Sequence, residues 1–260
     1  TQRARSCTWP LRMSIFAVGL LQYEYIIWYM VTIVTGYWPV TSKFSDGRYK
    51  EWFSRTLRVN CPYIIYGPSD VLEELKLYRQ GLPTEYRTLN IGDFETARFR
   101  ERLGTHPVHA PSKELHLIWH EKVFLLQRAM RENPFSSDWF VWADAGHCTY
   151  RSTPPPEVPW PDMTQIERLP RDKFIFTSSE RPYFEPWRGG YYHYISGTFM
   201  MHKSIIDSYC RKYLEALEEL LDGSWIYTDQ VVHTRIYQRQ PELFHKIGDG
   251  YGVIIPLLYR

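Results

Sequence analysis

Short apolar runs alternate along the chain with segments in which apolar side chains recur every three or four positions. Residues 31–35 form a β-branched run that ends at Gly36, and residues 49–57 follow with helical spacing. Residues 61–67 repeat the strand pattern, and residues 69–77 repeat the helix pattern after a Ser-Asp cap. Because β-branched apolar runs favour strands and a spacing of three to four favours helices, the order is strand, helix, strand, helix. Such an order is typical of a parallel sheet covered by helices.

The same alternation continues through the second half of the chain. A helix is expected over residues 112–133, and strands are expected over residues 139–144, 173–177 and 195–200. A second helix is expected over residues 206–223. Ser112 is a preferred N-cap residue, and the Asn133-Pro134 pair ends the first of these helices. Residues 81–111 contain several turn-forming Gly and Pro residues and predict no regular element. We therefore expect one α/β domain over residues 31–260.

The first 30 residues permit two interpretations. Residues 13–34 are largely apolar and follow Arg12, which is the arrangement of a signal anchor with a positive flank. Glu24 would be costly in the hydrocarbon of a bilayer, which favours an N-terminal extension over residues 1–30. Membrane association through residues 13–30 would make the protein face a secretory lumen. Without an anchor, a cytoplasmic or membrane-peripheral location is expected.

Charge and composition exclude several classes of protein. Lys and Arg number 31 against 29 Asp and Glu, a net charge of +2, and no long basic run occurs, so a nucleic-acid partner is not expected. The 4 Cys form no C-x-x-C pair, which argues against a structural zinc site and a disulfide scaffold. The 10 Trp and 20 Tyr provide apolar faces with polar edges, on which sugar rings stack. An aromatic core explains them equally well.

Polar or flexible residues stand at the ends of predicted strands, where ligands bind in α/β sheets. Gly36 follows the first strand and allows close approach of the backbone. Asp144 emerges from an apolar strand and must be capped, paired or bound to a metal, because an unpaired buried carboxylate is costly. Gly197 interrupts a later strand, which indicates a bulge or a close approach. Asp229 is expected as the N-cap of a helix over residues 229–237, a position that also permits it to face a substrate.

A series of short motifs extends this pattern across the chain. In order they are Val31-Thr-Ile-Val-Thr-Gly-Tyr37, Lys43, Tyr49-x-x-Trp52, Pro62-Tyr-Ile-Ile-Tyr66, His116-x-x-Trp-x-Glu-Lys122, Asn133-Pro-Phe135, Phe140-Val-Trp-Ala-Asp-Ala-Gly146, Ser196-Gly-Thr-Phe199 and Thr228-Asp-Gln230. The series resembles the WlaTC/HtrL/YibB family of glycosyltransferase-like proteins over residues 31–247. Its most specific part is Trp-x-Asp-Ala-Gly combined with a later Asp-Gln. The resemblance implies a GT-A-type fold, a Rossmann-type mixed and mainly parallel sheet flanked by helices.

The activity that this resemblance implies is transfer of a sugar from a nucleotide-diphosphate donor to a hydroxyl of a glycan or glycoconjugate acceptor. Asp144 and Asp229 would be the catalytic carboxylates, with Asp229 either as general base or as the group that stabilises an oxocarbenium-like transition state. The donor would contact Thr35, Gly36, Lys122, Asp144, Ala145, Gly146, Arg151, Gly197 and Thr198. The acceptor would contact Gln230 and an aromatic loop that contains Trp187, Tyr191 and Tyr192. Core packing explains that loop equally well.

Metal dependence is left open by the same motifs. Asp144 stands where GT-A enzymes have the first acid of an Asp-x-Asp pair, which holds Mn²⁺ or Mg²⁺ against the donor diphosphate. Gly146 stands in place of the second acid. His245 would be a further metal ligand, by analogy with GT-A enzymes that use a late histidine. If no metal binds, Lys122 and Arg151 would stabilise the diphosphate instead.

A non-catalytic carbohydrate- or nucleotide-binding protein on the same fold is the alternative, because the second acid is missing. An enzyme loses turnover in Asp144→Asn or Asp229→Asn while it keeps its fold, whereas a binding protein has no turnover to lose. Other enzyme classes lack support in the sequence. No G-x-G-x-x-G loop follows the first strand, and neither G-x-S-x-G nor H-E-x-x-H occurs.

Overall fold

The sheet at the centre of the protein has seven strands in the residues described by a computed structural model, which are 30–105, 107, 110–179, 194–223 and 228–259. The strands are β1 (Val31–Gly36), β2 (Tyr63–Gly67), β3 (Thr84–Thr88), β4 (Trp139–Trp142), β5 (Phe174–Ser178), β6 (Ile195–His202) and β7 (Phe244–Asp249). Their order across the sheet is β3-β2-β1-β4-β6-β5-β7. β6 is antiparallel to both of its neighbours, and the other described pairs are parallel. The expected mixed, mainly parallel sheet is confirmed.

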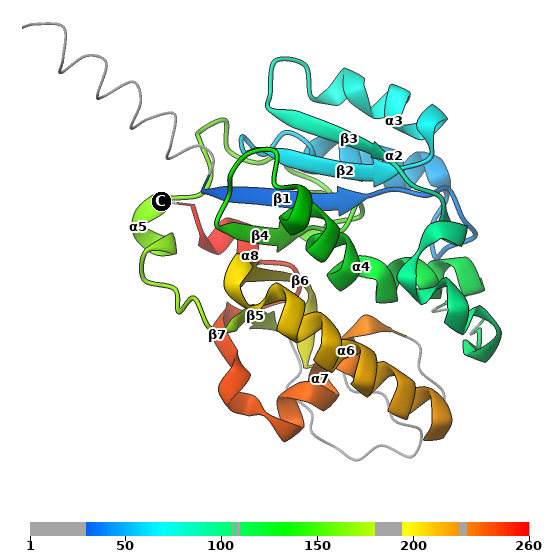
Figure 1. The fold of residues 1–260 in the computed structure, drawn as a ribbon. Coiled ribbons are helices and arrows are strands. Elements are labelled where there is room, and N and C mark those ends of the chain that lie inside the picture. Colours follow the sequence, from blue (N-terminus) through cyan, green and yellow to red (C-terminus); the bar gives the residue numbers. More distant parts are fainter. Residues whose placement is uncertain (1–29, 106, 108–109, 180–193, 224–227, 260) are drawn as a thin grey trace, which may run out of the picture.

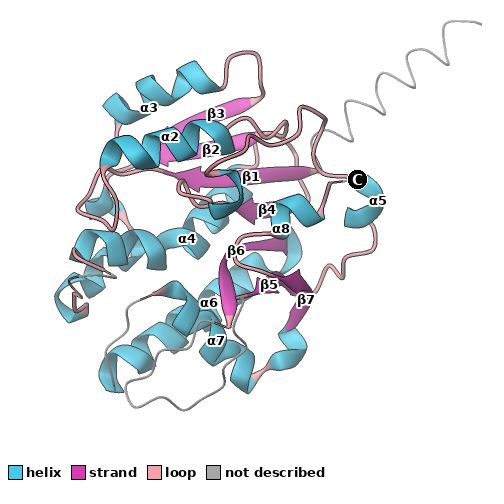
Figure 2. Cartoon of the chain, turned by 180° about the vertical axis from the view of Figure 1, so that it is seen from behind, coloured by secondary structure: helices cyan, strands magenta, loops and turns pink. Residues whose placement is uncertain are grey.

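Helices cover both faces of this sheet. They are α2 (Asp46–Thr56), α3 (Ser69–Leu75), α4 (Lys113–Glu132), α5 (Met163–Ile166), α6 (Lys203–Gly223), α7 (Asp229–Arg239) and α8 (Ile254–Leu257), with 3₁₀ segments at Lys76–Tyr78, Ile91–Asp93, Glu95–Arg102, Cys148–Tyr150 and Pro241–Leu243. α4 and α6 lie on the face toward the viewer in Figure 1. α2 and α8 lie on the opposite face, which is in front in Figure 2. The described part of the chain therefore forms a helix–sheet–helix sandwich.

Each face of the sheet buries its own apolar core. In β1, Ile33 packs in the core that contains Phe53 of α2. Its neighbour Val34 packs in the core that contains Leu125 of α4. Successive side chains of a strand point to opposite faces, so a strand covered on both sides must be apolar at nearly every position. This double burial explains why β2 and β4 are nearly continuous apolar runs in the sequence.

Helix α4 begins and ends where the sequence predicts. The Ser112 hydroxyl accepts a hydrogen bond from the backbone N–H of Leu115 at 3.2 Å, which caps the first turn. Asn133 ends the helix in the left-handed region, with φ 38°. Asparagine tolerates this region better than most residues with a side chain. The long amphipathic helix thus has a fixed start and stop, and it carries Lys122 in the sheet-facing core layer.

Strands β3 and β7 are not predicted by the apolar pattern. β3 reads Thr-Glu-Tyr-Arg-Thr and is half-buried along most of its length. β7 reads Phe-His-Lys-Ile-Gly-Asp, with only its first residue fully buried. Both strands lie at the edges of the sheet. An edge strand is incompletely covered, and polar residues there help to prevent pairing with other chains, so its hydrophobic signal is weak.

No helix among the described residues is both long enough and apolar enough to cross a membrane. The segment over residues 13–30, which the sequence permits as an anchor, lies outside the described part of the chain except for Met30. The anchor, the domain boundary at residue 30 and the cellular compartment therefore stay predictions.

Candidate active site

A pocket of about 450 Å³ opens at the carboxyl ends of β1 and β4. Its walls come from the loop after β1, the start of α2, the first half of α4, the loop after β4, strand β6, the start of α7 and the turn after β7. Most residues that the sequence singles out lie in these walls, namely Gly36, Lys122, Asp144, Ala145, Gly146, Arg151, Thr198, Asp229 and Gln230. The pocket therefore lies where a parallel sheet places its ligands, beyond the carboxyl ends of the strands.

Lys122 lies at the centre of the polar side of the pocket. Its Nζ is 2.9 Å from Oδ1 of Asp144 and 3.0 Å from Oδ2 of Asp229. The lysine side chain is only 3% exposed. Burial lowers the pKa of Lys122, but the two carboxylates raise it by more, so the net pKa lies well above its ordinary value. Lys122 therefore stays charged and joins α4, the loop after β4 and α7 by one ammonium group.

Asp144 is the acid that emerges from the apolar strand β4. Its Oδ1 accepts a hydrogen bond from the indole N–H of Trp142 at 2.7 Å, in addition to the contact with Lys122. The requirement that a carboxylate leaving a buried strand be paired is met by these two donors. Asp144 is also the more accessible of the two carboxylates, with 27% of its side chain exposed against 4% for Asp229.

Asp229 is the first residue of α7, and Thr228 occupies the N-cap position. The structure thus shifts the predicted cap by one residue and leaves the Asp229 carboxylate directed at Lys122. Burial raises the pKa of the Asp229 carboxyl to about 6, while the Lys122 ammonium limits this rise. A carboxylate whose pKa lies near the operating pH is suited to general-base chemistry.

Gly197 lies beside Asp144 on the neighbouring strand β6. The antiparallel register pairs Trp142 with Phe199. Continued by two positions, the same register places Asp144 opposite Gly197. A methyl group added at Gly197 would lie 2.9 Å from the Tyr251 hydroxyl and 3.1 Å from Oδ2 of Asp144. The absence of a side chain at Gly197 is therefore what allows these two groups to meet there.

Gly146 is closed to an acidic side chain by aromatic packing. A Cβ atom at this position would lie 2.7 Å from the ring of Tyr49. The Tyr49 ring is itself packed edge-on against Trp52 of α2, at 5.6 Å between centroids. The position at which an Asp-x-Asp motif has its second acid is thus occupied by Tyr49, which explains why the sequence has glycine there.

Arg151 is held over the same aromatic group. Its guanidinium lies 4.1 Å from the ring centroid of Trp52 and donates to the carbonyl of Gly146 from Nε at 3.1 Å and from Nη2 at 2.9 Å. Stacking and two hydrogen bonds fix the plane of the guanidinium at the edge of the pocket. The predicted role of Arg151 as a cation that lines the site is therefore compatible with its position.

Lys43 is a third cationic side chain in the described walls of the pocket, together with Lys122 and Arg151. Its Nζ lies 5.4 Å from the ring centroid of Trp119, a favourable placement for an ammonium group. Burial lowers the pKa of Lys43, and the neighbouring charges of Lys122 and Arg151 lower it further. An anion bound beside Lys43 would therefore relieve the repulsion between these cations.

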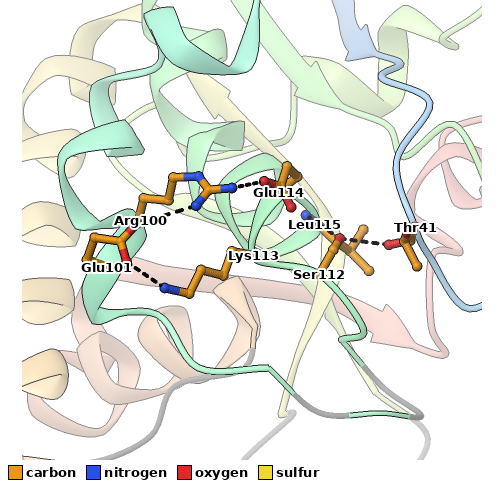
Figure 3. A network of polar contacts seen from close by, with 7 residues as sticks. All are labelled: Thr41, Arg100, Glu101, Ser112, Lys113, Glu114 and Leu115. Carbon is orange, nitrogen blue, oxygen red and sulfur yellow. Dashed lines mark hydrogen bonds and ion pairs between the residues drawn. The ribbon is translucent and has the colours of Figure 1, made fainter.

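The loop that carries Lys43 is fixed to the first turn of α4. The Ser112 hydroxyl donates to the carbonyl of Thr41 at 2.7 Å while it accepts from the N–H of Leu115, as Figure 3 shows. The rest of the network in Figure 3 consists of ion pairs of Arg100 with Glu101 and Glu114, and of Lys113 with Glu101. One serine therefore couples the cap of α4 to the position of the pocket loop.

Four of the predicted donor contacts need separate comment. Thr35 is fully buried and donates its hydroxyl to the carbonyl of Ala143 at 2.7 Å, so it joins β1 to the end of β4 and does not line the pocket. Its predicted donor contact is therefore corrected to a structural role. Gly36 does line the pocket, and a side chain there would collide with the Trp38 ring. Ala145 and Thr198 also line the pocket, and their contacts with a donor stay predictions.

The predicted acceptor site is described only in part. Trp187, Tyr191 and Tyr192 belong to residues 180–193, which lie outside the described residues. Gln230 is described and lines the pocket, but its amide nitrogen donates to the carbonyl of Ile195 at 2.7 Å. Gln230 thus holds the first turn of α7 against β6, and its role in acceptor binding stays a prediction.

His245 is not brought to Asp144. It lies exposed at the second position of β7 and pairs in register with Ile175 of β5. β7 is separated from β4 by β6 and β5, which at about 4.8 Å per strand corresponds to roughly 14 Å across the sheet. Within the described residues no group of three His, Cys, Asp or Glu side chains is arranged to hold a metal ion. The predicted pairing of Asp144 with His245 at a metal is thus corrected by the sheet topology.

Sequence reasoning missed three residues that complete the pocket, Lys43 as a cation, Tyr251 beside Asp144, and His147. His147 is buried, lines the pocket and stacks on Tyr150 at 5.5 Å between centroids. Burial lowers the pKa of His147 to about 4, so it is neutral near pH 7. Lys43 does occur in the motif series, whereas nothing in the local pattern of Tyr251 indicates a site. Tyr251 enters the pocket only because β7 completes the sheet.

Comparison with solved structures shows distant similarities of fold. They include 4-diphosphocytidyl-2C-methyl-D-erythritol synthase from Anaerococcus prevotii DSM 20548, with 10% sequence identity, a TM-score of 0.40 and coverage of 85% of this chain and 89% of that chain. Rv0371C of Mycobacterium tuberculosis H37Rv, in complex with manganese, gives 10% identity, a TM-score of 0.40 and coverage of 85% and 89%. The apo-form glycosyltransferase GlyE of Streptococcus pneumoniae TIGR4 gives 10% identity, a TM-score of 0.42 and coverage of 84% and 44%. No curated protein matches the sequence.

A family comparison covers most of the pocket. The family HtrL_YibB, described as "Bacterial protein of unknown function", matches residues 86–254, about two thirds of the chain. The matched range includes Lys122, Asp144, Gly197 and Asp229. It agrees with the family resemblance of the sequence motifs. The chain therefore belongs to the HtrL_YibB family.

Proposed function

We propose that the protein is a glycosyltransferase that moves a sugar from a nucleotide-diphosphate donor to a hydroxyl group of a glycan or glycoconjugate. The proposal is carried by one pocket in which a buried carboxylate with a raised pKa lies near cationic side chains that lack carboxylate partners among the described residues. The carboxylate is Asp229, and the cations are Lys43 and Arg151. A base and a positively charged pocket are the two requirements for displacing a diphosphate by a hydroxyl.

Asp229 is the general base of the proposed reaction. The acceptor oxygen attacks the anomeric carbon of the donor, and its proton passes to the Asp229 carboxylate. The bond between that carbon and the diphosphate oxygen breaks, and the nucleoside diphosphate leaves with the electron pair. With a pKa of about 6, the carboxylate is mostly ionised at neutral pH and is still basic enough to accept the proton. Such a single displacement inverts the anomeric configuration.

The diphosphate of the donor is proposed to lie against Lys43 and Arg151. A guanidinium held in a fixed plane suits bidentate hydrogen bonding to phosphate oxygens, and an ammonium group adds a compact charge. Trp119, Phe44 and Tyr49 line the same part of the pocket and offer rings on which a base or sugar can stack. The acceptor contacts of Trp187, Tyr191, Tyr192 and Gln230 remain part of this proposal.

A catalytically inactive carbohydrate- or nucleotide-binding protein is the second candidate. It is favoured by one observation, the occupation of the second-acid position by Tyr49 beside Gly146. The two candidates share a binding site for a nucleotide sugar. They differ only in whether bound donor is turned over.

A two-step experiment tests the proposal. Thermal unfolding is first measured with UDP, GDP, CMP, dTDP and their common sugar conjugates, since a ligand of the native state raises the melting temperature. Release of nucleoside diphosphate from the best donor is then followed in the wild type, in Asp229→Asn and in the control Asp172→Asn, an exposed aspartate paired with Lys173. Asp229→Asn is expected to lower kcat by about 10²- to 10⁴-fold and to leave the donor Kd unchanged. The control is expected to behave as the wild type.

Each alternative has its own outcome in this experiment. Equal losses of kcat and of donor affinity in Asp229→Asn would contradict its assignment as base. Selective binding without turnover in the wild type would support the binding protein. No shift with any nucleotide or sugar conjugate would contradict the transferase and would favour a non-catalytic protein that binds carbohydrate.

A further inference from the structure

A divalent cation at Oδ1 of Asp144 would need the place that Lys122 occupies. Mg²⁺ binds carboxylate oxygens at about 2.0–2.1 Å and prefers several oxygen ligands. Two of the carboxylates that line the pocket, Asp144 and Asp229, already flank the Lys122 ammonium at 2.9 Å and 3.0 Å. A metal ion at the same oxygens would stand next to a buried positive charge, and such repulsion is strong where water is excluded.

The remaining oxygen positions around Asp144 do not complete a metal site. Oδ1 of Asp144 also accepts the Trp142 indole N–H. A second acid in the Asp-x-Asp position is excluded, because Tyr49 fills the space beside Gly146. His245 lies on the far edge strand of the sheet. Among the described residues, Oδ1 of Asp144 and Oδ2 of Asp229 therefore hold an ammonium group where a divalent cation would bind.

The positive charge that a metal would bring is present in side chains. Lys122 pairs with both the Asp144 and the Asp229 carboxylate, so these three side chains carry one net negative charge against the two positive charges of Lys43 and Arg151. Neither Lys43 nor Arg151 has an ion pair in the part of the chain that the structure describes; Lys43 lies over Trp119, and Arg151 is bonded to a backbone carbonyl. The repulsion that lowers the pKa of Lys43 would be relieved by a bound anion. Two oriented cations thus remain for an anionic ligand.

We propose that Lys122, Lys43 and Arg151 take the place of the divalent cation, so that the protein binds the diphosphate of its donor without a metal. Lys122 pairs with the two acids and closes the metal position at Oδ1 of Asp144. Lys43 and Arg151 contact the diphosphate oxygens and stabilise the charge of the leaving group. This inference rests on the proposed function, because it concerns the diphosphate of the proposed donor.

Calorimetric titration of the full chain tests the inference. The probes are inorganic pyrophosphate in EDTA, and UDP, GDP, CDP and dTDP in EDTA and again in Mn²⁺. At least one probe is expected to bind in EDTA, and the nucleotide that binds is expected to keep its affinity in Mn²⁺. Lys43→Met and Arg151→Met are each expected to weaken binding by about tenfold or more, because each removes a charge-assisted hydrogen bond. Arg151→Lys retains the charge and is expected to lose less affinity than Arg151→Met.

Matched controls are Lys246→Met and Arg131→Met, which remove exposed cations outside the pocket. They are expected to bind as the wild type does, which separates a site effect from a general loss of positive charge. Circular dichroism of each variant establishes that the fold is kept. Arg151→Lys provides a second reading if Arg151→Met loses its packing on Trp52.

The outcomes separate the inference from the proposed function. Nucleotide binding that appears only in Mn²⁺ would overturn metal independence and leave the transferase proposal standing. Binding in EDTA that is insensitive to Lys43→Met and to both Arg151 variants would overturn the role of these cations. Failure of every probe in both buffers would overturn the inference together with the proposed function on which it rests.

Discussion

The Nζ of Lys122 lies 3.0 Å from Oδ2 of Asp229, so a residue of α4 compensates the charge at the first residue of α7. Both side chains are nearly inaccessible, at 3% and 4% exposure. Breaking a buried pair by removing one partner leaves an uncompensated charge, which is more costly than replacing both. The pair therefore links the stability of the fold to the chemistry of the pocket.

Lys122→Met is expected to destabilise the protein by about 3–5 kcal/mol, the typical cost of removing one partner of a buried ion pair. Urea unfolding measures this change. The double variant Lys122→Met/Asp229→Asn is expected to recover part of the loss, because the amide removes one of the two unpaired carboxylates. A double variant no more stable than Lys122→Met would contradict the charge-compensation role.

The loss of stability in Lys122→Met, relative to the wild type, is expected to depend on pH. Without Lys122, the folded-state pKa of Asp229 rises further above its unfolded value, because burial and Asp144 both disfavour its charged form. A raised carboxyl pKa contributes stability at low pH that is lost as pH rises through the folded value. Unfolding of Lys122→Met at pH 5 and pH 8 is therefore expected to show a smaller deficit, relative to the wild type, at the lower pH.

Transfer activity is expected to depend on ionisation of Asp229. With its pKa raised to about 6 by burial, the carboxylate is protonated below that pH and cannot accept a proton. Consequently kcat/KM should rise about tenfold per unit of pH below 6 and level off above it. A fall of kcat/KM centred near pH 4 would instead indicate protonation of His147, whose pKa is lowered to about 4. The profile is measured with saturating acceptor, or with water as acceptor, at constant ionic strength.

Gly197→Ala is expected to lower activity while the fold is kept. The added methyl group would lie 2.9 Å from the Tyr251 hydroxyl and 3.1 Å from Oδ2 of Asp144, and must displace them. Gly47→Ala is the matched control, because no atom lies within 4 Å of its added methyl group and the residue is in the first turn of α2. The control should keep full activity and gain up to about 1 kcal/mol of stability. Equal activity in the two variants would refute the contact around Gly197.

Ser112→Ala is expected to lower the melting temperature by about 2–4 °C, since loss of an N-cap costs about 1 kcal/mol. It should also weaken nucleotide binding, because the hydrogen bond from Ser112 to Thr41 holds the loop that carries Lys43. Ser54→Ala, which removes an exposed hydroxyl within α2, serves as control for the loss of a serine. Calorimetry and thermal unfolding measure both effects. Unchanged nucleotide affinity in Ser112→Ala would show that the loop does not depend on this bond.

The sequence by itself determined the elements whose burial is complete. β2 and β4 are apolar at nearly every position, and β1 and β6 combine apolar residues with Thr, Ser, Gly or His; all four strands are buried at every position. The start and stop of α4 follow from local hydrogen bonding at Ser112 and Asn133, which depends on neighbours in the chain alone. The position of Asp144 after strand β4 and the position of Asp229 at the start of α7 were predictable from the local sequence for the same reason.

Only the tertiary structure decided which of these groups meet. The contact of Lys122 with both acids depends on how α4 packs against β4 and α7, and Tyr49 reaches Gly146 only because α2 lies on the opposite face of the sheet. The sheet order likewise separates His245 from Asp144 and brings the turn after β7 to the pocket. Local patterns encode the backbone state and the burial of a segment. The distances between segments are set by packing of side chains that are remote in the sequence. The sequence therefore indicated many of the residues that form the site, but not which of them contact one another.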